Sequence, residues 1–197
     1  MPIVLVRHGE TASNAQRVLQ HPETPLSEHG LAQARRVAER LARNGVAEIL
    51  ASDYARALTT AELIRDACGA PLRIDPELRE RNFGDLRGRP YADLDFDPFA
   101  PDYVPPAGES WEDLHRRVDR MWERASARAA EVVGDGDLVL VTHGLVCHSL
   151  VSRRIDLAGA ECAPGRFANT SVTVVEAAPP WRLLLLGCVA HLQPAPP

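Results

Sequence analysis

Short apolar runs bounded by polar residues recur along the chain and alternate with amphipathic stretches. Such runs are typical of strands that are buried on both faces of a sheet. They predict strands at residues 2–6, 47–51, 72–74, 138–142, 171–176 and 182–189. The last two are expected to form a hairpin at a sheet edge.

Apolar residues at helical spacing predict helices between these strands. Ser27 is expected to cap the first helix, which ends at Asn44-Gly45. Asp53 is expected to cap the second, which carries Arg56 in its first turn and ends near Gly69.

Two further helices are predicted in the second half of the chain. Ser110 with Asp113 resembles a capping box that opens a long helix. Its apolar stripe holds Trp111, Leu114, Val118, Met121 and Ala125. A shorter helix is expected at about residues 145–153.

Strands that alternate with helices predict a three-layer α/β/α sandwich around a mainly parallel sheet with an antiparallel edge strand. We expect one domain at residues 1–192, followed by a disordered tail at 193–197. The proline-rich stretch at 95–108 cannot form a regular helix and predicts an ordered surface loop or lid. The oligomeric state stays open, and a homodimer that pairs through the sheet edge near 171–176 is one arrangement.

The charges exclude several classes of function. The chain of 197 residues has 22 basic and 27 acidic side chains and a net charge of −5, which argues against a nucleic-acid or membrane-surface binder. Every basic residue is arginine. The absence of lysine excludes a Walker-type phosphate loop, a Schiff-base enzyme and a lysine general base. Arginine is suited to a bidentate grip on phosphate or carboxylate.

The cysteines and the amino-terminal residues bear on location. No CxxC pair occurs, so the cysteines are interpreted as small hydrophobic residues in a reducing compartment. They are Cys68, Cys147, Cys162 and Cys188. The amino-terminal run is too short for a signal peptide, and no apolar run has the ~20 residues that a membrane span needs. We expect a cytoplasmic protein that does not bind membranes.

Two segments of the chain mirror each other. A predicted buried strand runs into His8-Gly9, and another runs into His143-Gly144. Ligands bind at the carboxyl ends of the strands in an open α/β sheet, so the two histidines are expected to face each other across one crevice. The alternative is that a histidine at a strand end only caps a turn.

Charged residues flank these histidines in the predicted fold. Arg7 precedes His8, and Arg56 lies in the first turn of a helix, where free N–H groups favour an anion. Arg56 could also be a solvated surface charge. Glu80 lies between two arginines, as an ion-pair residue or as the proton donor that a pair of histidines lacks.

Six blocks of sequence, in order, resemble the histidine phosphatase superfamily, in its phosphoglycerate-mutase-like branch. The resemblance covers nearly the whole chain. The blocks are Val6 to Thr11 with Asn14; Thr24 to Ser27 with Gly30, Gln33 and Ala34; Ala51 to Ala57 with Thr60 and Ala61; Leu78 to Glu80 with Gly84; Pro105 to Ser110; and Val141 to Gly144.

The resemblance implies a mechanism and a set of site residues. His8 would be the nucleophile that forms a phosphohistidine, and Glu80 would protonate the leaving alkoxide and then take a proton from water. Arg7, Arg56 and His143 would hold the phosphoryl oxygens. Substrate binding would fall to Thr11, Asn14, Gln20, Gly144 and Leu145. No metal and no cofactor is implied, and the partner is a small phosphorylated substrate.

Three activities remain open within this family: phosphatase, cofactor-dependent phosphoglycerate mutase and non-catalytic phosphate binding. Mutases are longer between the glutamate block and the second histidine, and carry additional basic residues there. Here that interval is short and its middle is acidic, which favours a phosphatase such as the α-ribazole phosphate or broad-specificity types. A non-catalytic member would be expected to lack His8, Glu80 or an arginine of the clamp.

The chain departs from the family pattern at two places. Gly84-Asp85-Leu86-Arg87-Gly88 stands where Gly-x-Trp-Glu-Gly is common, and Gln20-His21-Pro22 replaces the usual Gln-Gly pair. Both departures affect substrate contacts rather than phosphoryl chemistry. Five aromatic residues either form an apolar wall for a bulky alcohol or pack the loop onto the long helix: Tyr91, Phe96, Phe99, Tyr103 and Trp111.

Overall fold

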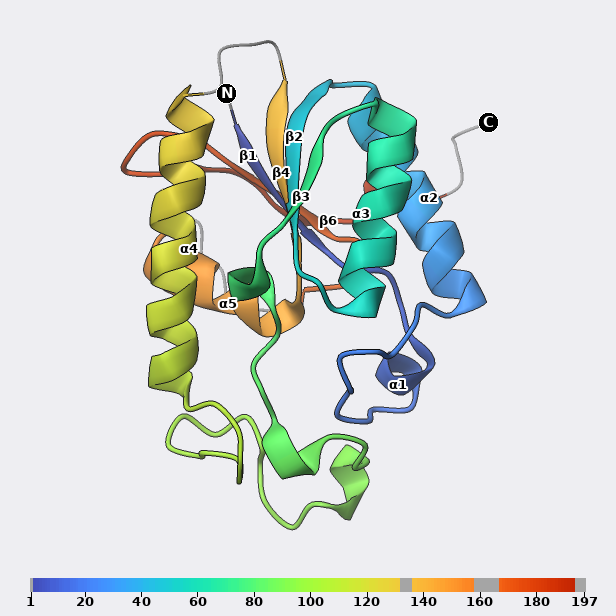
Figure 1. The fold of residues 1–197 in the computed structure, drawn as a ribbon, viewed down its shortest axis with the longest axis vertical. Coiled ribbons are helices and arrows are strands. Elements are labelled where there is room, and N and C mark those ends of the chain that lie inside the picture. Colours follow the sequence, from blue (N-terminus) through green and yellow to red (C-terminus); the bar gives the residue numbers. More distant parts are fainter. Residues whose placement is uncertain (1, 132–135, 158–166, 194–197) are drawn as a thin grey trace.

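The computed structural model describes residues 2–131, 136–157 and 167–193. Its centre is a sheet with the strand order β3-β2-β4-β1-β5-β6 (Figure 1). The strands are β1 (Ile3–Arg7), β2 (Val46–Ala51), β3 (Leu72–Ile74), β4 (Asp137–Thr142), β5 (Val172–Val175) and β6 (Leu183–Cys188). The first four run parallel, and β5 is antiparallel to both of its neighbours. The mainly parallel α/β architecture is therefore confirmed.

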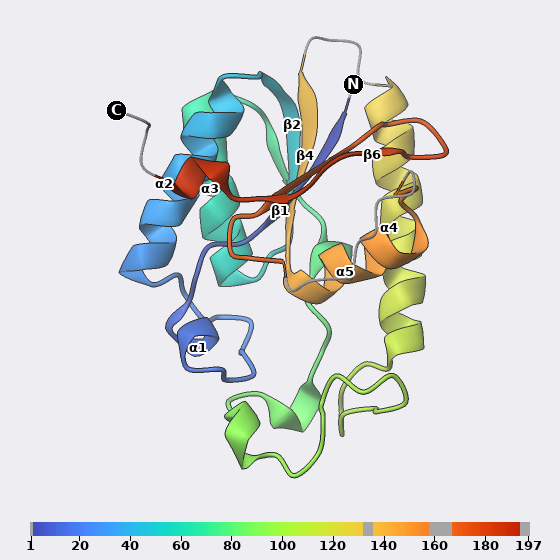
Figure 2. The same cartoon turned by 180° about the vertical axis from the view of Figure 1, so that it is seen from behind.

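Helices cover both faces of the sheet (Figures 1 and 2). On one face lie α2 (Glu28–Ala42) and α3 (Ala55–Cys68), and on the other lie α4 (Trp111–Glu131) and α5 (Gly144–Arg153). The short α1 (Ala12–Ala15) follows β1. The described residues also form the short 3-10 helices η1 (Pro76–Leu78), η2 (Gly84–Leu86), η3 (Tyr91–Asp93) and η4 (Ala190–Leu192).

Each central strand contributes to two separate cores because its side chains alternate between the faces. In β1, Val4 and Val6 pack against α2 and α3, whereas Ile3 and Leu5 pack against α4 and α5. Leu138 and Leu140 of β4 share the second core. This two-sided burial explains why the strands have unbroken apolar sequences rather than alternating ones.

One predicted cap is wrong. The residue that precedes α3 is Tyr54, and its side chain makes no capping hydrogen bond. The Asp53 carboxylate instead forms a bidentate ion pair with the Arg79 guanidinium, in which Asp53 Oδ1 lies 2.7 Å from Arg79 Nε. A bidentate pair with arginine is stronger than a single bond to a backbone amide, which explains the exchange of partners. The caps at Ser27 and Ser110 are confirmed.

The late hairpin lies at a sheet edge as predicted, but it does not leave residues 171–176 free. β5 pairs with β1 on one side and with β6 on the other, so the outer strands of the sheet are β3 and β6. Pairing of two copies through the 171–176 segment is therefore excluded.

Some predictions concern segments outside the description or only partly inside it. Residues 194–197 of the expected tail and Cys162 lie outside the described residues. Of the other cysteines, Cys147 is buried and Cys68 and Cys188 are half-buried, all as free thiols. Within the described ranges, no helix is long and apolar enough to cross a membrane.

Candidate active site

Two histidines meet at the carboxyl ends of the neighbouring strands β1 and β4. The register places Arg7 beside Thr142, and the His8 amide donates to the Thr142 carbonyl at 2.9 Å. The rings of His8 and His143 lie 5.1 Å apart, centre to centre. Both residues are buried. The strand topology therefore brings the two His-Gly pairs to one place.

The hydrogen bonds of His8 define which ring nitrogen is free to react. Nδ1 lies 2.7 Å from the Gly9 carbonyl, which can only accept, so Nδ1 carries the proton. Nε2 then has a lone pair, which accepts from Arg56 Nε at 3.3 Å. Burial lowers the pKa of His8 well below 6.5, and the charges of Arg56 and Arg7 lower it further. The ring is neutral at pH 7, with a nucleophilic Nε2.

His143 is held through its other ring nitrogen, Nε2. Its Nε2 lies 2.9 Å from Ser52 Oγ, and that oxygen already accepts from the Tyr54 amide at 3.2 Å. A Ser52 hydroxyl that donates to Nε2 places the proton of His143 on Nδ1, the same tautomer as in His8. Nδ1 is buried and has no hydrogen-bond partner among the described residues. Burial also lowers the pKa of His143 well below 6.5. A neutral N–H donor of this kind suits an anionic oxygen.

Arginines surround the two rings. Arg56 is buried in the first turn of α3, where its Nη1 donates to the His21 carbonyl at 3.0 Å. Burial lowers its pKa to about 10, so it stays charged at neutral pH. Arg56 forms no ion pair with a carboxylate in the part of the chain described. Arg7 donates to the Phe167 carbonyl. The buried positive charge of Arg56 favours an anionic ligand.

Glu80 accepts hydrogen bonds from two backbone amides. The Leu145 amide lies 3.2 Å from Oε1 and 3.3 Å from Oε2, and the Arg81 amide lies 3.1 Å from Oε1. These amides and the charge of Arg56 lower its pKa, but the larger effect of burial raises the pKa above its usual value. A carboxyl group with a raised pKa is a suitable proton donor.

These side chains line a cavity of about 540 Å³. Of the residues proposed from sequence, Arg7, His8, Asn14, Gln20, Arg56, Glu80, Gly144 and Leu145 line it. His143 and Thr11 are fully buried and are not among its lining residues. The Thr11 hydroxyl donates to Gln20 Oε1 at 2.8 Å and accepts from the Asn14 amide at 3.0 Å. Thr11 therefore positions two cavity residues from behind.

Two glycines allow the loop after β1 to approach α2 closely. A Cβ at Gly30 would lie 2.0 Å from the Glu10 carbonyl oxygen, and one at Gly9 would lie 2.5 Å from the Gly30 carbonyl oxygen. Neither position has room for a side chain. The pair explains why both glycines belong to the same sequence pattern as His8.

Sequence reasoning missed several residues of the site. Asn169 donates to the His8 carbonyl at 3.0 Å and to Asn14 Oδ1 at 3.2 Å. It is distant in sequence from every block and carried no local signal. Ser52 and Tyr54 lie within a block already noted, so their neighbourhood could have pointed to them. Arg87 also lines the cavity, and its Nη2 donates to the Tyr54 hydroxyl at 3.1 Å.

Both segments that depart from the family pattern contribute to the site. In the 20–22 segment, Gln20 lines the cavity and the His21 carbonyl accepts a hydrogen bond from Arg56. In the 84–88 segment, Arg87 lines the cavity. Of the five aromatic residues, Tyr91, Phe99 and Trp111 line the cavity, whereas Phe96 stacks on Tyr103 within the loop, with the ring centres 4.7 Å apart.

No cluster of three or more His, Cys, Asp or Glu side chains suited to a metal ion occurs in the residues that the structure describes.

The sequence and the fold both match known proteins. The family model of the histidine phosphatase superfamily (branch 1) matches residues 3–186. A probable phosphoglycerate mutase GpmB of Yersinia pestis is 34% identical, over 98% of this chain and 95% of that protein.

Solved structures of phosphatases are similar as well. Mycobacterial glucosyl-3-phosphoglycerate phosphatase in complex with inorganic phosphate superposes with a TM-score of 0.81 and 30% identity, over 98% of this chain and 99% of that chain. A putative alpha-ribazole-5'-P phosphatase from Escherichia coli has a TM-score of 0.81 and 26% identity, over 96% and 97% of the two chains.

Proposed function

This chain belongs to the histidine phosphatase superfamily, and we propose that it is a metal-independent phosphatase that hydrolyses a small phosphorylated metabolite through a phosphohistidine. The observation that carries the proposal is the tautomer of His8. Its Nδ1 proton is engaged by the Gly9 carbonyl, which leaves the Nε2 lone pair for attack.

The first half of the reaction forms the phosphohistidine. His8 Nε2 attacks phosphorus, the ester P–O bond breaks on the opposite side, and Glu80 gives its proton to the departing alkoxide. Arg7, Arg56 and the Nδ1–H of His143 bind the non-bridging oxygens, whose charge they stabilise in the transition state.

The second half returns the enzyme to its starting state. The Glu80 carboxylate takes a proton from a water molecule as the water oxygen attacks phosphorus. The N–P bond breaks, inorganic phosphate leaves, and Glu80 is protonated again for the next cycle.

A phosphatase is favoured over a mutase by the segment between Glu80 and His143. Its middle carries Asp93, Asp95, Asp97 and Asp102, and one of these, Asp97, lines the cavity. A carboxylate there disfavours the second acidic group that a phosphoglycerate mutase must hold. The mutase remains the second candidate because of the similarity to the protein from Yersinia pestis.

The test is phosphate release from a panel of phosphomonoesters in EDTA. The panel contains p-nitrophenyl phosphate, α-ribazole phosphate, phosphoserine, sugar phosphates and 3-phosphoglycerate. We expect release by the wild type and a loss of about 10³-fold or more in His8→Ala. His29→Ala, which removes an exposed histidine of α2, is the matched control. An acid-labile phosphoenzyme should form in the control and not in His8→Ala.

Two other results would contradict the proposed phosphatase activity and indicate a different function. Isomerisation of 3-phosphoglycerate only in the presence of a bisphosphate primer, without phosphate release, would make the protein a mutase. Inactivity of the folded protein in both assays would indicate a phosphate-binding domain. A cytoplasmic location and a homodimer remain predictions, which cell fractionation and sedimentation would test.

A further inference from the structure

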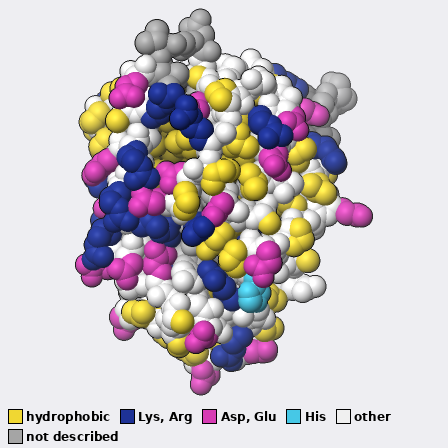
Figure 3. All heavy atoms as spheres, in the orientation of Figure 1, with side chains coloured by type: hydrophobic (Ala, Val, Ile, Leu, Met, Phe, Trp, Pro, Cys, Tyr) yellow, Lys and Arg dark blue, Asp and Glu magenta, His cyan; other side chains and the backbone are white. Residues whose placement is uncertain are grey.

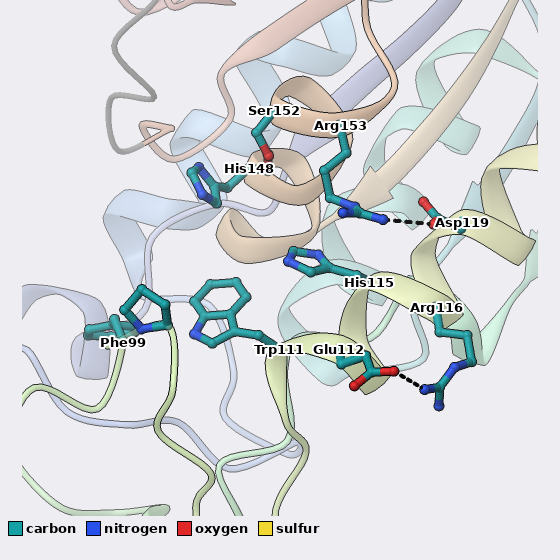
Figure 4. Close-up of a pocket in the computed structure, with 10 residues that line it drawn as sticks. Phe99, Trp111, Glu112, His115, Arg116, Asp119, His148, Ser152 and Arg153 are labelled. Atoms are coloured by element: carbon teal, nitrogen blue, oxygen red, sulfur yellow. Dashed lines mark hydrogen bonds and ion pairs between the residues drawn. The ribbon is translucent and has the colours of Figure 1, made fainter.

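A second hollow, of about 600 Å³, lies between α4 and α5 beside the candidate active site. One face of α4 and one face of α5 form its walls, and the loop at Phe99 and Pro101 closes one end (Figure 4). In Figure 4, Phe99, Trp111 and His148 lie toward one side and two ion pairs toward the other. We call this hollow the α4–α5 groove.

The groove adjoins the active-site cavity. Phe99, Trp111 and His148 line both spaces. The Trp111 indole N–H donates to the Ala100 carbonyl at 3.0 Å, which fixes the ring at this junction. The two spaces therefore meet at these three side chains, and a ligand long enough to extend past them would occupy both.

The side on which the leaving group departs also favours the groove. In an in-line displacement the leaving group departs opposite the attacking atom, here on the side of Glu80. The Leu145 amide at the start of α5 binds the Glu80 carboxylate. His148 follows three residues later, about 4.5 Å further along the helix. A leaving group that takes its proton from Glu80 is thus directed along α5 toward His148 and the groove.

The charged residues of the groove are paired with one another. Glu112 binds Arg116 at 2.7 Å, and Asp119 binds Arg153 at 3.1 Å. His115 also lines the groove. Burial lowers its pKa, so its ring is neutral at pH 7. A charged ligand would have to compete with these pairs, so the groove favours an uncharged one.

His148 supplies hydrogen-bonding capacity at the junction. It is half-buried, burial lowers its pKa, and its ring nitrogens have no hydrogen-bond partner in the described part of the chain. A neutral imidazole offers one donor and one acceptor, which matches hydroxyl groups. The Trp111 ring already packs against the Arg81 guanidinium at 4.7 Å and the His115 ring at 5.6 Å. These contacts favour a hydroxyl-bearing group over a planar ring that must stack.

We propose that the α4–α5 groove binds the distal part of the substrate's leaving group, and that this part is an uncharged ring bearing hydroxyl groups, such as a sugar. The inference rests on the proposed phosphatase function and adds to it the shape and chemistry of the substrate.

The test compares three esters that break the same primary P–O bond: glycerol 3-phosphate, its 1-O-glucosyl derivative and its 1-O-benzyl derivative. The quantity measured is the ratio of kcat/KM for each extended ester to that for glycerol 3-phosphate. We expect a ratio of about ten or more for the glucosyl ester in the wild type. Ser152→Trp, which fills the groove from α5, and His148→Leu should each reduce the ratio toward one. His29→Trp introduces the same ring on an exposed helix elsewhere and should leave the ratio unchanged.

The other outcomes are separable. Equal kcat/KM for glycerol 3-phosphate and the glucosyl ester would overturn the inference and leave the phosphatase intact. A benzyl ester that outperforms the glucosyl ester would overturn the proposed hydroxyl chemistry. A high glucosyl ratio that survives in both Ser152→Trp and His148→Leu would place the sugar outside the groove. If neither these esters nor any ester of the phosphomonoester panel is hydrolysed, the proposed function itself fails; if only esters of the panel are hydrolysed, the inference alone fails.

Discussion

His8 and His143 share the pattern Leu-Val-x-His-Gly but have different roles, because a different ring nitrogen is held in each. The carbonyl of the next residue fixes His8, whereas a serine 91 positions away fixes His143. The repeated strand-His-Gly pattern therefore predicted that the residues meet. It could not predict which ring nitrogen of His143 is held, because its partner Ser52 lies outside the pattern.

At this scale, Glu80→Gln tests the proton donor. The raised pKa of Glu80 keeps the acid protonated to higher pH, so kcat/KM should fall as pH rises through that pKa. The lowered pKa of His8 keeps the nucleophile neutral, so kcat/KM should fall only as pH drops through that lower value. The variant should lose about 10²–10⁴-fold on alkyl esters and lose the alkaline limb of the profile.

p-Nitrophenyl phosphate provides the discriminating measurement for Glu80→Gln. Its leaving group needs little protonation, so its hydrolysis should fall much less than that of an alkyl ester. Glu77→Gln, three residues away and outside the cavity, is the control and should keep both limbs. An equal loss on both kinds of ester would argue that Glu80 is not the acid.

Ser52→Ala tests the orientation of His143. Without the hydroxyl, Nε2 loses its donor and the Nδ1 proton is no longer fixed, so kcat/KM should fall about tenfold or more. Nitrogen NMR of His143 should change from one tautomer to a mixture. Ser171→Ala is the matched control, since Ser171 is also buried but its hydroxyl has no partner among the described residues. An unchanged His143 spectrum in Ser52→Ala would contradict this assignment.

At the scale of elements, the strands and the four longer helices were predictable because each carries its own periodicity. The contacts that position the site were not. Asn169 lies 161 residues from His8 in the sequence, and the Asp53 pair with Arg79 displaced an expected helix cap. Such contacts depend on which elements become neighbours, and no local pattern encodes that.

One buried carboxylate links three elements. Glu48 of β2 is 2% exposed and binds Arg73 of β3 at 2.6 Å and Arg128 of α4 at 2.7 Å. Figure 3 shows the arginines gathered over α4, with acidic side chains between them. Glu48→Gln removes the charge from both bonds and should lower the free energy of unfolding by about 1.5–3 kcal/mol.

Urea denaturation would measure the effect of Glu48→Gln. Glu131→Gln removes a carboxylate that lies 3.9 Å from the same Arg128 but is exposed, and should change stability by less than about 1 kcal/mol. Equal effects of the two variants would show that burial does not strengthen the Glu48 pairs.

At the scale of the whole molecule, the positive cavity makes stability depend on phosphate. An anion that binds only the folded state at about 100 times its Kd adds about 2.7 kcal/mol, which raises Tm by roughly 5–10 °C for a chain of this size. Arg56→Gln should lose most of this rise, whereas Arg65→Gln on the exposed side of the same helix should keep it. A calorimetric series at constant ionic strength would measure both, and an equal rise in the two variants would place phosphate elsewhere.

The place of β1 in the sheet has a consequence for partial unfolding. β4 and β5 pair with it on its two sides, whereas β3 and β6 form the outer strands. Amide hydrogens of β1 should therefore exchange with deuterated solvent only when the whole molecule opens, and those of β3 and β6 should exchange much earlier. A molecule whose edge strands have frayed would still hold His8 and His143, which follow β1 and β4, in place, so these two histidines should be among the last parts of the site to separate before global unfolding.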